Sequence, residues 1–87
     1  MNLDRLSMVP AHATLKAAYS TLAGAQEFPA PMQAMGAAVL FHELCAVLRV
    51  DPSEMLDKAR RVTRHAEDHY SLELRALRTY IKEELNK

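Results

Sequence analysis

The histidines at positions 65 and 69 have the spacing that comes closest to a chemical motif. They stand four residues apart, which places two metal ligands on one helix face, and Glu73 follows one turn later. The segment matches neither helix motif of the zinc proteases, because no glutamate occupies the position that either motif requires. His42-Glu43 fails the same comparison. The sequence therefore predicts no metal site and no cofactor.

Catalytic residue patterns are also missing from the sequence. There is no glycine-rich phosphate loop and no nucleophile elbow. The single cysteine, Cys45, stands in an apolar run and should behave as a small core hydrophobe. It cannot form a disulfide within the chain, which favours a reducing cytoplasm as the location. We therefore predict a cytoplasmic protein that is not an enzyme.

Charge is unevenly distributed along the chain, although the formal net charge is zero. Residues 1–57 sum to −3, residues 58–82 to +4 and residues 83–87 to −1. If the last third formed one continuous helix, a single arc would carry Arg60, Arg64, Arg75, Arg78 and Lys82. Such an arc could contact nucleic acid or an acidic partner. No aromatic residue interleaves with it to stack on bases, so a solvated helix face is the simpler interpretation.

The elements that must position these residues are helices. A chain of 87 residues with 49% hydrophobic and 25% charged residues is typical of one small domain, here residues 1–87. No alternation of β-branched residues indicates strands. We predict an all-α bundle of about four helices, at residues 11–23, 31–48, 52–64 and 67–85, with a short turn at 3–8. We predict a break before residue 67, because one continuous helix from residue 52 could not pack fully onto so small a domain; that long helix is the alternative.

The helix at 31–48 should be the central, buried one. Its apolar run is shorter than a membrane span and contains His42 and Glu43, so we expect no membrane contact. The start of the chain lacks the pattern of a signal peptide. The predicted core consists of Leu15, Tyr19, Met35, Val39, Leu40, Leu44, Val47, Leu48, Leu56, Ala59, Leu74, Leu77 and Ile81.

A tight joint between two helices is predicted at residues 48–54. Asp51 can accept hydrogen bonds from the first N–H groups of the next helix, and Pro52 suits the first helical position. Segment 44–58 resembles the helix-turn-helix of repressor-type regulators, in which the second helix enters the major groove of DNA. The apolar positions that carry this resemblance are Leu44, Leu48, Val50 and Met55, with Cys45 as the small residue.

The same segment departs from the helix-turn-helix pattern at several positions. Arg49 stands where a glycine is usual, and Lys58 stands where the second helix normally buries an apolar residue. The would-be DNA-reading face carries Glu54 and Asp57, which repel phosphates. An ordinary helical hairpin is the simpler interpretation.

The last predicted helix has more apolar surface than one buried side needs. Its main stripe is Tyr70, Leu74, Leu77, Ile81 and Leu85. A second strip, on a different face, is formed by Leu72, Ala76 and Tyr80. We predict that this strip binds a partner, with a two-fold homodimer as the expected form. The alternative is a helix buried on several sides.

Two segments are similar in style to small helical accessory proteins of tailed bacteriophages. They are Ala30-Pro31-Met32-Gln33 and the run from Val50 to Ala59. This resemblance implies a non-catalytic interaction module that binds and modulates a bacterial host protein. The alternative function is that of a helix-turn-helix transcriptional regulator that binds DNA.

Overall fold

The computed structural model of the chain describes residues 3–86, and every regular element in this range is a helix. In chain order the elements are α1 (Leu3–Ser7), α2 (Ala11–Ala23), α3 (Ala30–Leu48), α4 (Pro52–Asp68), α5 (Leu72–Tyr80) and a π-helical turn, η1 (Ile81–Leu85). The all-α prediction is confirmed, as are the first two main helices to within one residue.

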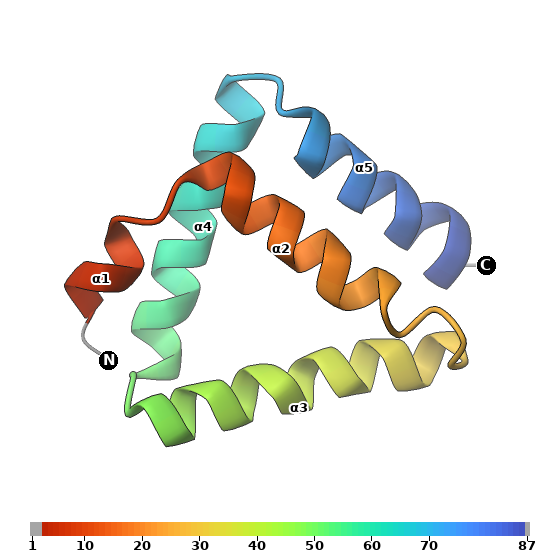
Figure 1. Cartoon of the computed structure of the whole chain (residues 1–87), viewed down its shortest axis with the longest axis horizontal. Helices are drawn as coiled ribbons and strands as arrows, with labels where there is room; N and C mark the ends of the chain where they lie inside the picture. The colour runs from red at the N-terminus through yellow and green to blue at the C-terminus, as the bar shows by residue number, and fades with distance from the viewer. Residues whose placement is uncertain (1–2, 87) are drawn as a thin grey trace.

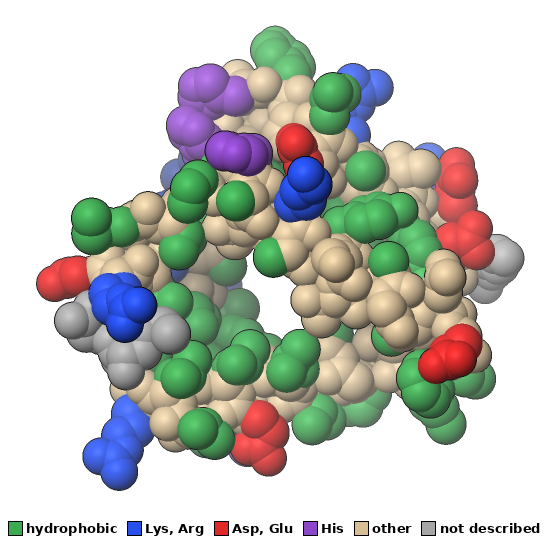
Figure 2. Space-filling view, viewed as in Figure 1, with side chains coloured by type: hydrophobic (Ala, Val, Ile, Leu, Met, Phe, Trp, Pro, Cys, Tyr) green, Lys and Arg blue, Asp and Glu red, His purple; other side chains and the backbone are tan. Residues whose placement is uncertain are grey.

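The helices are arranged as a flat, open triangle. The three sides are α2, α3 and α4, while α5 lies alongside α2 and continues through η1 to the beginning of α3 (Figure 1). The molecule measures 36 × 31 × 18 Å along its principal axes. Packed helix axes lie about 8–10 Å apart, so the shortest dimension corresponds to about two helix layers. Figure 2 shows an opening in the middle of this slab.

The core is small and lies where α2, α4 and α5 meet. Leu15, Ala66 and Leu74 form its buried cluster, and the half-buried Val62 packs against them. Burial of these side chains holds α2 to α4 and to α5. A second buried pair, Cys45 and Val50, lies at the joint between α3 and α4. The helix α3 is thus attached to the rest of the molecule mainly near its two ends.

The core prediction is wrong for most of its residues, because they are exposed. Leu15 and Leu74 are buried and Leu48 and Leu77 are half-buried, as expected of core positions. The others are exposed, namely Tyr19, Met35, Val39, Leu40, Leu44, Val47, Leu56, Ala59 and Ile81. The prediction assumed that each apolar helix face finds a neighbour within the chain. In the open triangle, most of α3 has none.

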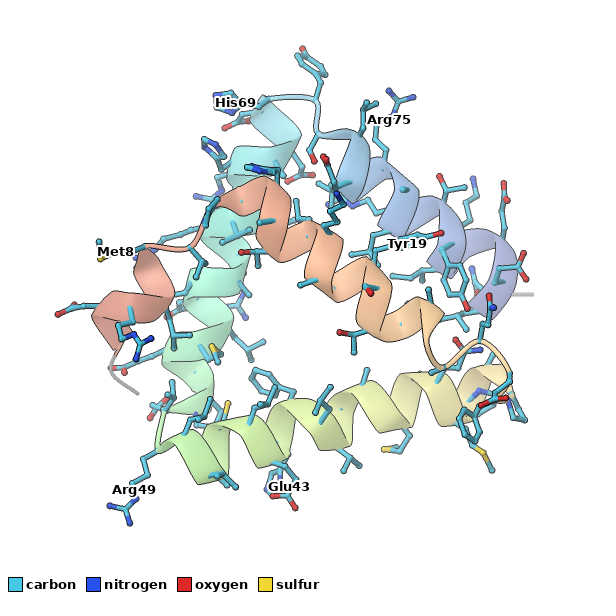
Figure 3. The ribbon with its side chains drawn as sticks, viewed as in Figure 1. Met8, Tyr19, Glu43, Arg49, His69 and Arg75 are labelled. Atoms are coloured by element: carbon cyan, nitrogen blue, oxygen red, sulfur yellow. The ribbon has the colours of Figure 1, made fainter. Side chains whose placement is uncertain are left out.

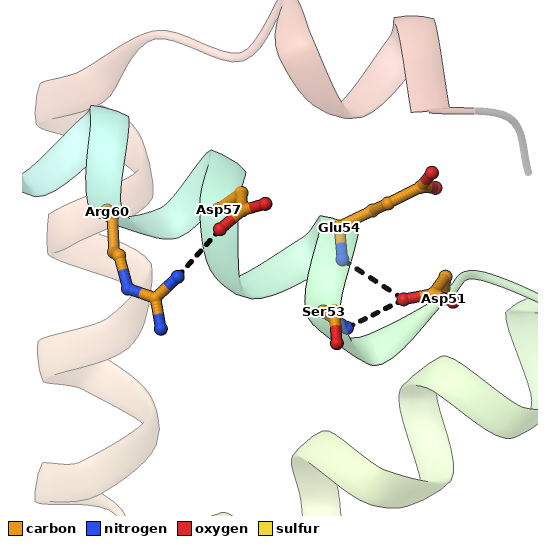
Figure 4. A network of polar contacts seen from close by, with 5 residues as sticks. All are labelled: Asp51, Ser53, Glu54, Asp57 and Arg60. Carbon is orange, nitrogen blue, oxygen red and sulfur yellow. Dashed lines mark hydrogen bonds and ion pairs between the residues drawn. The ribbon is translucent and has the colours of Figure 1, made fainter.

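The joint between α3 and α4 is built from two complementary caps. Asp51 Oδ1 accepts hydrogen bonds from the N–H groups of Ser53 at 2.8 Å and Glu54 at 3.2 Å (Figure 4), which confirms the predicted cap. On the other side, Arg49 has a left-handed backbone conformation, and the Val50 N–H donates to the Cys45 carbonyl at 2.9 Å. These bonds form a Schellman motif that ends α3.

The break between the last two helices exists, but it lies later than predicted. Helix α4 extends to Asp68 instead of residue 64, and α5 begins at Leu72 instead of residue 67. A second Schellman motif ends α4, with Tyr70 left-handed and the Ser71 N–H donating to the Ala66 carbonyl at 2.9 Å. Ser71 then caps α5 through its hydroxyl. Tyr70 is therefore an exposed turn residue and not part of the predicted apolar stripe.

Candidate interaction site

The helix α3 combines an apolar composition with an exposed position. Glu43 is the one charged residue among its 19, and apolar side chains point to all sides of the helix. Such helices are normally buried. Here Met35 is 65% and Val47 is 77% exposed, so the expectation of a buried helix is wrong. In Figure 2, hydrophobic side chains follow the lower edge of the molecule, where α3 lies.

Length and composition alone would also allow α3 to cross a membrane. Only 11% of its most apolar stretch is buried within the chain. The core helix of a soluble protein passes the same test of length and hydropathy. Glu43 points away from α2 in Figure 3, and the neighbouring His42 is also exposed.

An apolar groove of about 700 Å³ runs between α2 and α3, and we call it the α2–α3 groove. Ala18, Thr21 and Leu22 contribute one wall, and Gly36, Leu40 and Leu44 contribute the other. None of the described residues that line the groove is charged. The α3 residues follow one another at intervals of four, which places them on one side of the helix. The groove is therefore long and apolar, the shape that receives an apolar helix face.

Gly36 in the middle of α3 leaves free space at the groove. A Cβ atom added to this glycine would meet no atom within 4 Å. A mid-helix glycine costs about 0.5–1 kcal/mol of helix stability relative to alanine. No close contact within the described chain requires a glycine at this position. The missing side chain lets a bound group approach the α3 backbone closely.

Gln33 is a side chain that positions α3 and that sequence reasoning missed. It is the buried polar residue of α3, with 6% exposure. Its Nε2 donates to the Phe28 carbonyl at 2.8 Å, and its Oε1 accepts from the Tyr80 hydroxyl at 3.1 Å. These bonds fasten the beginning of α3 to the connection before it and to the end of α5. The sequence feature that could have indicated this role is a lone amide side chain in an apolar helix.

The three residues of the predicted strip, Leu72, Ala76 and Tyr80, do line one surface of α5. They border a shallow depression of about 540 Å³ together with Tyr19. Leu72 is 72% exposed and Ala76 is exposed, whereas Tyr80 is half-buried. The Tyr80 ring makes an edge contact with Tyr19 at 5.9 Å between ring centres, in addition to its bond to Gln33. Part of the strip is thus already used within the chain.

The five basic residues do not form one arc. That prediction required a continuous helix, and α4 and α5 diverge at the break after Asp68 (Figure 1). The Arg60 guanidinium lies 2.6 Å from Asp57 Oδ1 (Figure 4), and that of Arg78 lies 3.1 Å from Glu67 Oε2. Arg64 belongs to α4, whereas Arg75 and Lys82 follow the break; all five are exposed. Phosphate contacts along one stripe are therefore not supported by this geometry.

The fold brings a third histidine close to the predicted pair. His65 and His69 stack with 4.1 Å between ring centres, and both line one surface depression with His12 from α2 and Glu73 from α5. Figure 2 shows the histidines gathered at one corner of the molecule. His69 Nδ1 lies 2.9 Å from the His65 carbonyl. In the described part of the chain, no group of three or more metal-ligating side chains has an arrangement that could hold an ion.

The pKa of Glu73, at the beginning of α5, lies below the ordinary value for a glutamate. The carboxylate accepts from its own backbone N–H, which is the main cause that lowers its pKa, and from the Ser71 hydroxyl at 3.2 Å. The positive charges of His12 and Lys16 lower the pKa further, whereas partial burial opposes the shift. This arrangement stabilises the negative charge at a helix N-terminus and indicates a structural role.

Comparisons with protein-family models, with curated proteins and with solved structures found no significant match to this chain. The argument about function therefore depends on the α2–α3 groove and the exposed face of α3.

Proposed function

We propose that this protein is a non-catalytic interaction module, and that it acts by binding another protein chain at the α2–α3 groove. The single observation that carries the proposal is the exposure of α3, a helix with apolar side chains on all sides. Leaving so much apolar surface in water is unfavourable, and contiguous patches of this kind mark interaction sites.

A protein partner fits this surface better than lipid. His42 and Glu43 interrupt the apolar sequence of α3 in its C-terminal half, and a helix that spans the bilayer would have to bury them at a cost. The α2–α3 groove, by contrast, has two helical walls and is free of charged side chains among the residues described. An amphipathic or apolar helix of a partner fills such a groove.

The resemblance to bacteriophage accessory proteins extends this proposal to a bacterial host protein as a target. The strip of Leu72, Ala76 and Tyr80 is the second candidate surface for such a partner. Leu72 and Ala76 are exposed beside charged residues such as Arg75, an arrangement that suits an interface with an apolar centre and a polar rim.

The alternative, a DNA-binding helix-turn-helix regulator, has weaker support. The joint at residues 48–54 is a tight turn between two helices, as such a motif needs. The exposed beginning of α4, however, carries Glu54 and Asp57, and Asp57 holds the nearest arginine, Arg60, in an ion pair. Negative charge on the helix that should enter the major groove opposes binding to phosphates.

Capture from a bacterial lysate tests the proposed function when groove variants are compared. Gly36→Glu places a charge in the groove, and its Cβ would meet no atom of the folded chain within 4 Å. Ala38→Glu adds the same charge to an exposed position of α3 that does not line the groove. We expect the wild type and Ala38→Glu to retain a partner and Gly36→Glu to lose it.

The proposed function is contradicted if no protein, from lysate or as pure chain, binds in a way that Gly36→Glu abolishes. Fluorescence anisotropy with duplex DNA gives the parallel test. Micromolar binding that weakens steeply with salt would favour the regulator instead.

A further inference from the structure

We infer that the occupant of the α2–α3 groove is a second copy of this chain, which docks its own α3 there by two-fold symmetry. This inference rests on the proposed function and names the partner for its main surface. Three observations carry it: the surface area of the single chain, the opening between its helices, and the match between the groove and the helix that lines it.

The single chain exposes more surface than a folded monomer of its mass. Its accessible surface is 6711 Å², whereas a compact protein of 9.8 kDa exposes about 5,200 Å². The excess is about 1,500 Å² per chain, or about 3,000 Å² for a pair. Permanent homodimers bury about 2,000–5,000 Å² in total. The excess therefore has the size of one obligate dimer interface.

The opening between α2, α3 and α4 leads to the same conclusion. It is bounded by three helices and leaves apolar side chains of α3 without a neighbour in the described chain (Figures 1 and 2). A second copy laid over this face covers the opening and the groove.

The groove and its α3 wall are complementary to each other. Gly36, Leu40 and Leu44 form an uncharged stripe on one side of α3, and this stripe would lie in the groove of the other copy. With the two-fold axis perpendicular to α3, the two α3 helices are antiparallel, so their dipoles oppose each other favourably. None of the described residues that line the groove is charged, so filling the groove itself buries no unpaired ion.

Docking at this position leaves the strip of α5 accessible. Leu72 lies at the end of α5 that is far from α3 (Figure 1). The pair would therefore present two copies of the exposed part of the strip, Leu72 and Ala76. These remain available to a different protein.

Sedimentation equilibrium of the purified full chain at several concentrations tests the dimer. We expect the wild type to have twice the monomer mass of 9.8 kDa and to dissociate on dilution. Gly36→Glu on one wall and Thr21→Glu on the other should each reduce the mass to that of the monomer. Thr21 is exposed and its hydroxyl bonds only back to the Ala17 carbonyl within α2, so its replacement does not disturb the core. Ala38→Glu should remain dimeric. Circular dichroism checks that each variant is helical.

Three results would overturn the inference. A wild type that is monomeric at every concentration excludes the dimer, while groove-dependent capture of another protein would still support the proposed function. A dimer that survives both groove variants but dissociates with Leu72→Asp and Ala76→Asp uses the strip instead. Flotation of the wild type, but not of Gly36→Glu, with neutral phosphatidylcholine vesicles would identify the groove as a lipid-binding face.

Discussion

Arg49 and Tyr70 hold a left-handed backbone conformation that side chains disfavour. Their φ angles are 57° and 52°, and each residue ends a helix in a Schellman motif. For residues other than glycine this conformation costs about 1–2 kcal/mol, because Cβ crowds the following carbonyl oxygen. Both side chains are exposed, so neither residue recovers this cost by packing in the core. The two helix ends are therefore maintained by their hydrogen bonds and by the caps that follow.

Replacing Tyr70 by glycine should stabilise the fold. The side chain is 85% exposed, so little packing is lost, and glycine relieves the strain at φ 52°. We expect the free energy of unfolding to rise by about 0.5–1 kcal/mol for Tyr70→Gly. Urea unfolding followed by circular dichroism measures this free energy. Tyr70→Ala, which keeps Cβ, is the matched control and should show no gain; an equal gain there would contradict the role of the backbone.

At the scale of the elements, some boundaries could be predicted from the sequence and others could not. The cap at Asp51 with Pro52 after it is a local signal, since the bonds of a cap span only three residues, and it was predicted correctly. The break before α5 depends on Ser71, a capping residue that follows a left-handed tyrosine. Tyrosine gives no signal for that conformation. The apolar spacing of Tyr70 suggested a helical stripe in its place.

The exposure of α3 could not be read from the sequence for a different reason. Periodicity shows which side chains are apolar, but it does not show whether their neighbours lie in the same chain. Gly36 and Leu40 have the same pattern in a buried central helix as in the wall of an open groove. The strip of Leu72 and Ala76 was found because a second apolar face exceeds the needs of one docking side. The same reasoning applied to α3 would have found the groove.

The beginning of α5 predicts how acid should affect the fold. Bonds from the Glu73 backbone N–H and the Ser71 hydroxyl lower the Glu73 pKa below its ordinary value of 4.5. A carboxylate with a depressed folded-state pKa stabilises the fold above its unfolded pKa, and this stabilisation is lost as the pH falls through the folded value. We expect Glu73→Gln to reduce the loss of thermal stability below pH 4.5.

Thermal unfolding of both proteins over a series of acidic pH values measures this effect. Glu27→Gln, which removes one negative charge from the exposed connection before α3, is the control. Parallel curves for the wild type and Glu73→Gln over the whole acid range would contradict the prediction.

At the scale of the whole molecule, one hydrogen bond joins two helices that are far apart in the sequence. Tyr80 and Gln33 are 47 positions apart, and their contact joins the end of α5 to the beginning of α3. Near its beginning, α3 is held by this bond, by η1 and by the bond from Gln33 to the Phe28 carbonyl. The angle between α2 and α3, and with it the width of the groove, therefore depends on a few contacts near the beginning of α3 and not on a large core.

Tyr80→Phe should weaken this closure while keeping the aromatic pair with Tyr19. The substitution leaves Gln33 Oε1 without the hydroxyl donor, and we expect a loss of about 1 kcal/mol in the free energy of unfolding. Tyr19→Phe keeps the ring of the same pair and should have a smaller effect, since the bond to Gln33 comes from Tyr80. Chemical denaturation of both variants gives the comparison. Equal losses would show that the bond to Gln33 contributes nothing specific.

The opening bounded by α2, α3 and α4 has a consequence for the heat capacity of the chain. Unfolding raises the heat capacity in proportion to the apolar surface that becomes hydrated, by about 1.0–1.3 kcal/mol/K for a compact chain of 87 residues. In the single chain much of α3 is already hydrated, so its heat-capacity increment should lie below this range. Its stability should then vary little with temperature. Once another chain covers the opening, the heat-capacity increment of unfolding should be larger, and the free energy of unfolding should curve more strongly with temperature. Differential scanning calorimetry would therefore detect whether the opening is covered.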